Sequence, residues 1–169
     1  MTDPIKLIGN VASPYTRKMV AYLRYKRIPY EVIWGQPEDI LMSMNIEAPK
    51  PILLPVFILD RDGQATAVTD STPLIREFEA KYPERSVLPK DPALSFINFV
   101  LEDFGDEWCT KFMFHYRWHF DEDADNAGTI LPLGINSNLK DDELAFFKEH
   151  FAKRQIDRLW VVGSNNDTA

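Results

Sequence analysis

The chain has 169 residues, enough for one domain or two small ones and for a buried apolar core without disulfides or metal ions. Hydrophobic residues make up 45% and charged residues 27%, which is typical of a globular protein and excludes wholesale disorder. With 19 basic and 26 acidic residues the net charge is −7, and no basic run is present to neutralise phosphates. Composition therefore argues against a nucleic-acid-binding protein and against a basic helix on a membrane surface.

The cysteine content and the N-terminus bear on the compartment. Cys109 is the single cysteine, which excludes an internal disulfide framework and a zinc site made of cysteines alone. We expect it to lie buried on a helix as a small apolar residue. The sequence shows neither the basic and apolar start of a signal peptide nor a run of about 20 apolar residues. It therefore favours a cytoplasmic protein.

The first 34 residues predict a strand, a helix and a second strand. Residues 5–9 form a short apolar run typical of a buried strand. A helix is expected over residues 14–26, opened by Ser13 as its cap and by Pro14 at its first position. Residues 30–34 have the alternating pattern of another strand.

The next segment predicts a hairpin followed by a helix. In chain order, the expected elements are a short helix at 38–44, a strand at 52–59, a turn at 60–63, a return strand at 65–68 and a helix at 73–81. The turn has the sequence Asp-Arg-Asp-Gly, a hairpin signal. A β-α-β unit implies parallel strands, whereas the hairpin implies antiparallel ones. The sequence therefore predicts a thioredoxin-like α/β domain over residues 1–82.

The rest of the chain reads as an all-α part over residues 93–169. A linker rich in proline is expected over residues 83–92. The expected elements after it are one long helix at 92–121, a loop at 121–138 and a second helix at 141–162 with Gly163 as its C-terminal cap. The loop is expected because glycine and proline interrupt helices, and this segment contains Gly128, Pro132 and Gly134.

The first motif that could carry chemistry runs from Ser13 to Arg17, between a strand and the N-terminus of a helix. Free N–H groups and the helix dipole favour an anion there, and a serine hydroxyl can donate a hydrogen bond to a thiolate. A glutaredoxin-type pair would need cysteines at positions 13 and 16, so dithiol exchange is excluded at this site. A role for Ser13 as a helix cap alone stays open.

Two further motifs flank the predicted hairpin. A cis bond between Leu54 and Pro55 would expose the backbone of Leu54 to a peptide ligand, whereas a trans bond before an edge strand is equally compatible with the sequence. Asp70 could pair with a ligand amine, and Ser71 with its N–H could hold a carboxylate. The alternative for both residues is again helix capping.

Taken together, these motifs resemble the cytosolic glutathione transferases, most closely over residues 5–82. The resemblance is carried by Ser13-Pro14-Tyr15-x-Arg17-Lys18, Ile28-Pro29-Tyr30-Glu31, Leu54-Pro55-Val56 and Asp70-Ser71-x-x-Leu74-Ile75. It implies that glutathione is a co-substrate bound along the thioredoxin-like domain by Tyr15, Leu54, Pro55, Asp70 and Ser71. Ser13 would be the catalytic residue that faces the sulfur, as in the serine-type classes of the family.

The resemblance also implies a second pocket, for a small electrophile, on the helical part. The candidates are Trp108, Phe112, His115 and Tyr116, although packing of a core is an alternative role for most of them. His115 and His119 are spaced as two metal ligands could be, but no third ligand stands out and we predict no metal site.

Members of this family are usually longer, and their later core helix, which begins with a Ser/Thr-x-x-Asp cap, has no counterpart among the helices that this sequence predicts. The resemblance therefore implies a truncated α domain. We expect exposed apolar side chains at Trp108, Phe112, Phe151 and Trp160, which a homodimer could cover. The leading hypothesis is an enzyme that activates the glutathione thiol for attack on an electrophile. The alternative is a non-catalytic glutathione-binding or protein-interaction module of the same fold.

Overall fold

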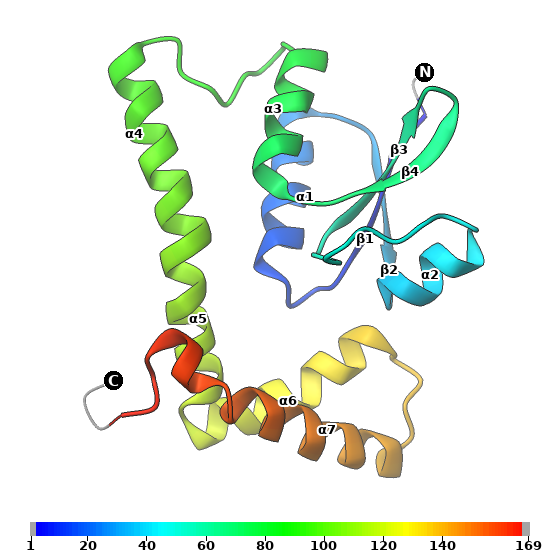
Figure 1. Cartoon of the computed structure of the whole chain (residues 1–169), viewed down its shortest axis with the longest axis vertical. Coiled ribbons are helices and arrows are strands. Elements are labelled where there is room, and N and C mark those ends of the chain that lie inside the picture. The colour runs from blue at the N-terminus through cyan, green and yellow to red at the C-terminus, as the bar shows by residue number, and fades with distance from the viewer. Residues whose placement is uncertain (1–2, 167–169) are drawn as a thin grey trace. The chain divides into compact units, whose positions relative to one another are not determined.

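A four-stranded mixed sheet forms the centre of the first unit in the computed structural model, which describes residues 3–166 (Figure 1). The strands are β1 (Ile5–Gly9), β2 (Tyr30–Trp34), β3 (Val56–Arg61) and β4 (Gln64–Val68), in the spatial order β2-β1-β3-β4. β1 and β2 are parallel, while β3 is antiparallel to β1 and β4. This arrangement confirms the expected strand directions.

Helices cover both faces of this sheet (Figure 1). Helices α1 (Pro14–Lys26) and α3 (Ser71–Lys81) pack on one face, and α2 (Pro37–Ser43) packs on the other. Neighbouring residues of one strand enter different cores, because side chains alternate along a strand. Leu7 and Phe57 join the core under α1 and α3, whereas Ile8 and Val56 join the core under α2. The thioredoxin-like α/β architecture is thereby confirmed.

The element boundaries of this unit agree with the sequence to within two residues, except at the start of the third strand. Asp62 and Gly63 form the hairpin turn with φ of 55° and 82°, the left-handed pair that favours a tight turn between twisted strands. The third strand begins at Val56 and not at Ile52. Pro55, directly before it, has no N–H to donate to a sheet ladder, which accounts for the later start.

The second unit, Pro89–Ala169, is helical. Its elements are α4 (Pro92–Asp103), a π-helical turn η1 (Phe104–Trp108), α5 (Cys109–Trp118), α6 (Asp121–Ile135), α7 (Asp141–Ile156) and a 3-10 turn η2 (Leu159–Val162). The expected helix over residues 92–121 therefore contains a π turn and ends at Trp118. The expected helix over residues 141–162 ends at Ile156, and Gly163, with φ of 74°, caps the separate 3-10 turn instead.

The loop expected over residues 121–138 was wrong, because most of that segment is helix α6. Small residues let α6 approach α7 closely. A Cβ added to Gly128 would lie 3.1 Å from Cγ of Lys148 and 3.4 Å from Cβ of Ala152. This tertiary packing stabilises a helix that contains Gly128 and Pro132, both of which lower intrinsic helix propensity.

In the second unit, the exposure of the apolar side chains and of Cys109 agrees only in part with what the sequence predicts. Trp108, Phe112 and Trp160 are about half exposed or more, as expected. Phe151 instead packs edge-on against Trp118, with ring centroids 5.8 Å apart, in the small core of the unit. Cys109 is exposed, which corrects the expectation that it is buried. None of the described helices combines the length and the apolar character that crossing a bilayer requires.

Candidate functional site

The register of the sheet brings the three motifs of the first unit to one end. Ile8 of β1 lies opposite Val56, the first residue of β3, and the last residue of β4 lies opposite the second residue of β3. Because β1 and β4 run against β3, their ends meet the start of β3 at the same end of the sheet. Ser13 and Asp70 follow β1 and β4, and Leu54 precedes β3, so the three segments converge there.

Ser13 is held at the N-terminus of α1 by the loop before it. Its hydroxyl accepts a hydrogen bond from the N–H of Thr16 at 3.2 Å, and its own N–H donates to the carbonyl of Asn10 at 3.0 Å. Asn10 and Thr16 are buried, and the N–H of Asn10 donates to Oγ1 of Thr16 at 3.3 Å. The hydroxyl of Ser13 therefore has a fixed position where the helix dipole favours an anion.

Asp70 and Ser71 open α3 in an unusual backbone geometry. Asp70 has φ of 80° and ψ of 115°, a conformation that costs a non-glycine residue about 1–3 kcal/mol and concentrates at functional sites. Its carboxylate accepts from the N–H of Thr72 at 3.3 Å. Ser71 is buried, and its hydroxyl accepts from Nζ of Lys18 at 3.2 Å, which ties α1 to α3.

The remaining candidates of the first unit lie beside these residues. The Leu54–Pro55 bond is cis, one of the two alternatives that the sequence left open. Pro55 is buried and Leu54 is half-buried directly before β3, while Tyr15 is half-buried in the first turn of α1. The first turns of α1 and α3 contain no acidic residue. This end of the sheet thus offers two helix N-termini, the half-buried Leu54 before β3 and a carboxylate to a ligand.

The candidates for the second pocket lie in the second unit, along the π turn and α5. Trp108 ends the π turn, and Phe112, His115 and Tyr116 follow in α5. The ring of His115 stacks on that of His119 at 4.6 Å and meets that of Tyr116 edge-on at 5.0 Å. Among the residues that the structure describes, Nδ1 of His115 is a buried atom without a hydrogen-bond partner.

Metal ligation has no support from side-chain positions. No group of three or more His, Cys, Asp or Glu side chains within residues 3–166 is arranged to hold a metal ion. His115 and His119 are adjacent, but two ligands alone do not make a closed site.

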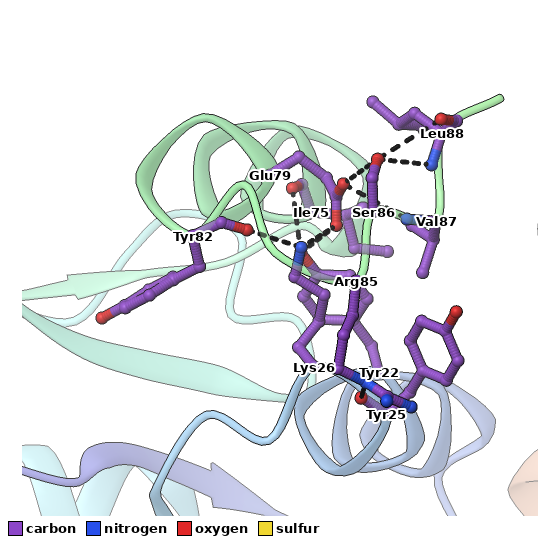
Figure 2. A network of polar contacts seen from close by, with 10 residues as sticks. All are labelled: Tyr22, Tyr25, Lys26, Ile75, Glu79, Tyr82, Arg85, Ser86, Val87 and Leu88. Carbon is purple, nitrogen blue, oxygen red and sulfur yellow. Dashed lines mark hydrogen bonds and ion pairs between the residues drawn. The ribbon is translucent and has the colours of Figure 1, made fainter. Parts of the chain in front are cut away.

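A buried charge network, which sequence analysis missed, joins α1 and α3 to the last residues of the first unit (Figure 2). Nζ of Lys26 lies 2.8 Å from Oε1 of Glu79, and the two side chains are 0% and 6% exposed. The hydroxyl of Tyr22 also donates to Oε1, at 2.8 Å. Ser86 and the N–H of Val87 donate to Oε2 at 2.5 and 3.2 Å. The signal in the sequence was one charged residue on the apolar face of each helix, Lys26 in α1 and Glu79 in α3.

The contacts of Glu79 determine its protonation. Burial alone would raise the pKa of Glu79, but the hydrogen bonds from Lys26, Ser86 and Tyr22 outweigh it, so the pKa lies below its ordinary value. Burial, together with the adjacent carboxylate, raises the pKa of Tyr22. The network therefore consists of an ionised carboxylate and a neutral phenol at neutral pH.

Comparisons with known proteins agree with this architecture. The family described as "Glutathione S-transferase, N-terminal domain" matches residues 7–86. No curated protein matches the chain. Similar solved structures include the beta-etherase LigF from Sphingobium sp. strain SYK-6, with 19% identity and a TM-score of 0.55 over 95% of this chain and 69% of that one.

Two other structures show the same likeness. A glutathione S-transferase from Rhodospirillum rubrum F11 has 22% identity and a TM-score of 0.52, covering 89% of this chain and 62% of that one. A Tau class glutathione S-transferase from mango, Mangifera indica, has 20% identity and a TM-score of 0.50, covering 92% and 58%. The chain spans about three fifths of the length of these two structures. Residues 7–86 of the chain are thus similar to the N-terminal domain of glutathione S-transferases.

Proposed function

We propose that the protein binds glutathione at the end of the sheet that carries Ser13, Leu54 and Asp70. The convergence of these three segments, fixed by the sheet register, is the observation that supports the proposal. Glutathione is a tripeptide with a thiol, two carboxylates and an amino group. The backbone of Leu54 would pair with that of its cysteine, Ser71 would hold the γ-glutamyl carboxylate, and Asp70 would accept from the amine.

Ser13 is the proposed catalytic residue. A free thiol with a pKa of about 8.5 is only about 3% thiolate at pH 7, and lowering that pKa by about two units takes about 2.7 kcal/mol. The N-terminus of α1 and one charge-assisted hydrogen bond are of that order. Because the oxygen of Ser13 already accepts from the N–H of Thr16, its proton is left to donate to the sulfur. The residue thus stabilises the thiolate without removing a proton itself.

A small electrophile is the proposed second substrate. The exposed rings of Trp108, Phe112 and Tyr116 offer an apolar surface, and π turns within helices occur frequently at functional sites. In the reaction, the thiolate forms a bond to an electrophilic carbon while the leaving group departs with its electron pair. The chain contributes the ionised state of the sulfur and the surface that holds the acceptor.

Calorimetric titration of the full chain with reduced glutathione at pH 7 tests the proposal. We expect one saturable site, weakened about tenfold or more by Ser71→Ala, because a buried hydrogen bond to a charged group is lost. Ser95→Ala removes an exposed hydroxyl from α4 and serves as the matched control, which should bind like the wild type. The absence of heat from folded protein at millimolar glutathione would contradict the proposal.

A measurement of turnover distinguishes the proposed enzyme from a non-catalytic glutathione-binding module. With an aryl halide as electrophile, Ser13→Ala should lower kcat about 10- to 100-fold, because the thiolate loses one hydrogen bond from a hydroxyl. Its affinity for glutathione should change much less. Saturable binding without any turnover by the wild type would instead favour the non-catalytic alternative.

We also propose that the protein is a cytoplasmic homodimer. The dimer is supported by α4, a helix with no buried residue and with large apolar side chains such as Phe96 and Leu101 more than 60% exposed. Sedimentation of the full chain should give twice the mass of 19.6 kDa, and Phe96→Glu should shift the equilibrium to the monomer. A wild-type monomer at all concentrations would contradict the dimer.

A further inference from the structure

A groove of about 490 Å³ lies along α2, on the surface of the first unit. Helix α2 covers the face of the sheet opposite the face under α1 and α3 (Figure 1). The lining comes from α2 and from the segment directly after it, and includes Glu38, Leu41, Met42, Ile46, Glu47 and Ala48. None of the residues proposed to bind glutathione lines the groove, so it is distinct from that site.

The groove is formed by a tight reversal of the chain at the end of α2. Asn45 has a φ of 55°. The N–H groups of Asn45 and Ile46 donate to the carbonyls of Met42 and Leu41, at 3.0 and 2.9 Å. These bonds form a Schellman motif, in which the residue after the turn packs back on the helix. Because Leu41 is buried and Ile46 and Ala48 pack against the same core, the floor of the groove has a fixed shape.

Two carboxylates give the groove its charge. Glu38 lies in the first turn of α2 and Glu47 lies after the reversal, and both are exposed. Within residues 3–166 neither of them forms an ion pair, and no basic side chain lines the groove. The sequence from Ile28 to Pro49 contains four acidic residues and no Lys, Arg or His. The groove is therefore complementary in charge to a cationic partner.

The groove also offers apolar surface that the fold leaves in water. Met42 is 76% exposed, and Met44, directly after the helix, is 39% exposed. Methionine is flexible and polarizable, and it recurs at surfaces that accept apolar side chains of a partner. Because Met42 and both carboxylates are exposed, the site suits the surface of a macromolecule better than an enclosed small ligand.

An apolar groove with a rim of one charge is the arrangement that receives an amphipathic helix of the opposite charge. We propose that this groove docks a basic amphipathic helix of a partner protein. An apolar side chain of that helix lies against Met42, and its Lys or Arg side chains pair with Glu38 and Glu47. The charge of the groove is the reason for choosing a basic partner.

Fluorescence anisotropy of a labelled model peptide with the full chain tests the proposal. The peptide has about 14 residues, long enough to form a helix on binding, with leucine on one face and lysine on the other. We expect saturable binding, weakened about tenfold or more by Met42→Lys, which places a like charge in the groove. Glu38→Gln/Glu47→Gln should weaken binding about three- to tenfold, because two charge contacts at the rim are lost.

Matched variants make the same changes away from the groove. Ile130→Lys replaces an apolar side chain of α6 that is 49% exposed, and Glu84→Gln/Glu149→Gln removes two exposed carboxylates. Both should bind the peptide like the wild type. Equal weakening by these controls, or no weakening by Met42→Lys, would show that the peptide binds elsewhere and would overturn the proposal.

Two measurements on the unmodified protein keep the test independent of how the variants fold. A scrambled peptide of the same composition and a peptide with glutamate in place of lysine should each bind about fivefold more weakly or worse. In amide correlation spectra recorded by NMR, the shifts caused by the peptide should be concentrated in residues 37–48. Equal affinity for the three peptides, shifts concentrated elsewhere, or no saturable binding at millimolar peptide would each contradict the proposal.

Discussion

At the scale of single residues, Glu79 is buried and forms an ion pair with Lys26, so the stability of the fold should depend on the charge of this carboxylate. Glu79→Gln would leave the ammonium group of Lys26, which is 0% exposed, without its counter-ion. We expect the free energy of unfolding to fall by about 3 kcal/mol at pH 7, as in other broken buried pairs. Urea denaturation of the wild type and the variant measures this decrease.

The matched control for this variant is an exposed ion pair on the same helix. Glu77 binds Arg61 through both carboxylate oxygens, at 2.8 and 2.6 Å, but the two side chains are 37% and 42% exposed. Glu77→Gln should therefore cost less than about 1 kcal/mol, because solvent screens an exposed pair. Equal losses for the two variants would show that burial does not determine the strength of the Glu79 pair.

The same carboxylate predicts how stability depends on pH. Since the folded-state pKa of Glu79 is lowered, its contribution is fully present above the unfolded pKa of about 4.3 and is lost as the pH falls through the folded-state value. The difference in unfolding free energy between the wild type and Glu79→Gln should therefore be constant from about pH 6 to 8 and shrink below about pH 4. A difference that grows on acidification would refute this sign.

At the scale of elements, the close approach of β1 to α1 depends on a residue without a side chain. A Cβ on Gly9 would lie 2.5 Å from Cγ2 and 3.2 Å from Oγ1 of Thr16. We expect Gly9→Ala to lower the free energy of unfolding by about 1–3 kcal/mol through overpacking. Thermal denaturation measures this loss of stability. Gly105→Ala is the control, because a Cβ added there meets nothing within 4 Å.

A second substitution tests whether this steric clash is the cause. Thr16→Ser removes the Cγ2 methyl group but keeps the hydroxyl that accepts from the N–H of Asn10. The Gly9→Ala/Thr16→Ser double variant should therefore recover at least half of the loss, after allowance for the effect of Thr16→Ser alone. Strictly additive losses would mean that Gly9 is required for another reason.

The elements also show which parts of the fold a sequence can specify. Local signals were sufficient where a cap or a turn decides the structure, as at Ser13 with Pro14 and at Asp62 with Gly63. They failed at α6, because Gly128 is favourable there only through its contact with Lys148 of α7, which lies 20 residues further along the chain. The π turn carries no sequence signal that we recognise.

In the candidate site, too, some features could be predicted from the sequence and others depend on tertiary packing. Its chemical groups stand in short motifs, and these were visible in the sequence. The features that position the groups were not, since they depend on the packed structure: the buried bond between Asn10 and Thr16, the left-handed backbone of Asp70, and the bond from Lys18 to Ser71. Motifs thus predict which residues meet a ligand, and tertiary contacts determine their geometry.

At the scale of the whole molecule, the two units differ in how much apolar surface they bury. Both faces of the first sheet are covered, and each face has its own core. The second unit has one small core, built around Trp118 and Leu159, and its helix α4 has no buried residue. Since burial of apolar surface is the main favourable term in folding, we expect the first unit to be the more stable of the two.

This difference predicts how fragments of the chain behave. Residues 1–88 alone should fold and unfold in one cooperative transition in urea, monitored by circular dichroism, whereas residues 89–169 alone should not. The fragment 1–82 is the informative comparison, because it lacks Ser86 and Val87, which donate to Glu79. We expect it to be less stable than 1–88 by about 1–3 kcal/mol, as for loss of hydrogen bonds to a buried charge. Equal stability of 1–82 and 1–88 would mean that the network of Glu79 does not hold residues 83–88 in place, and an unfolded 1–88 would show that the first unit depends on the second.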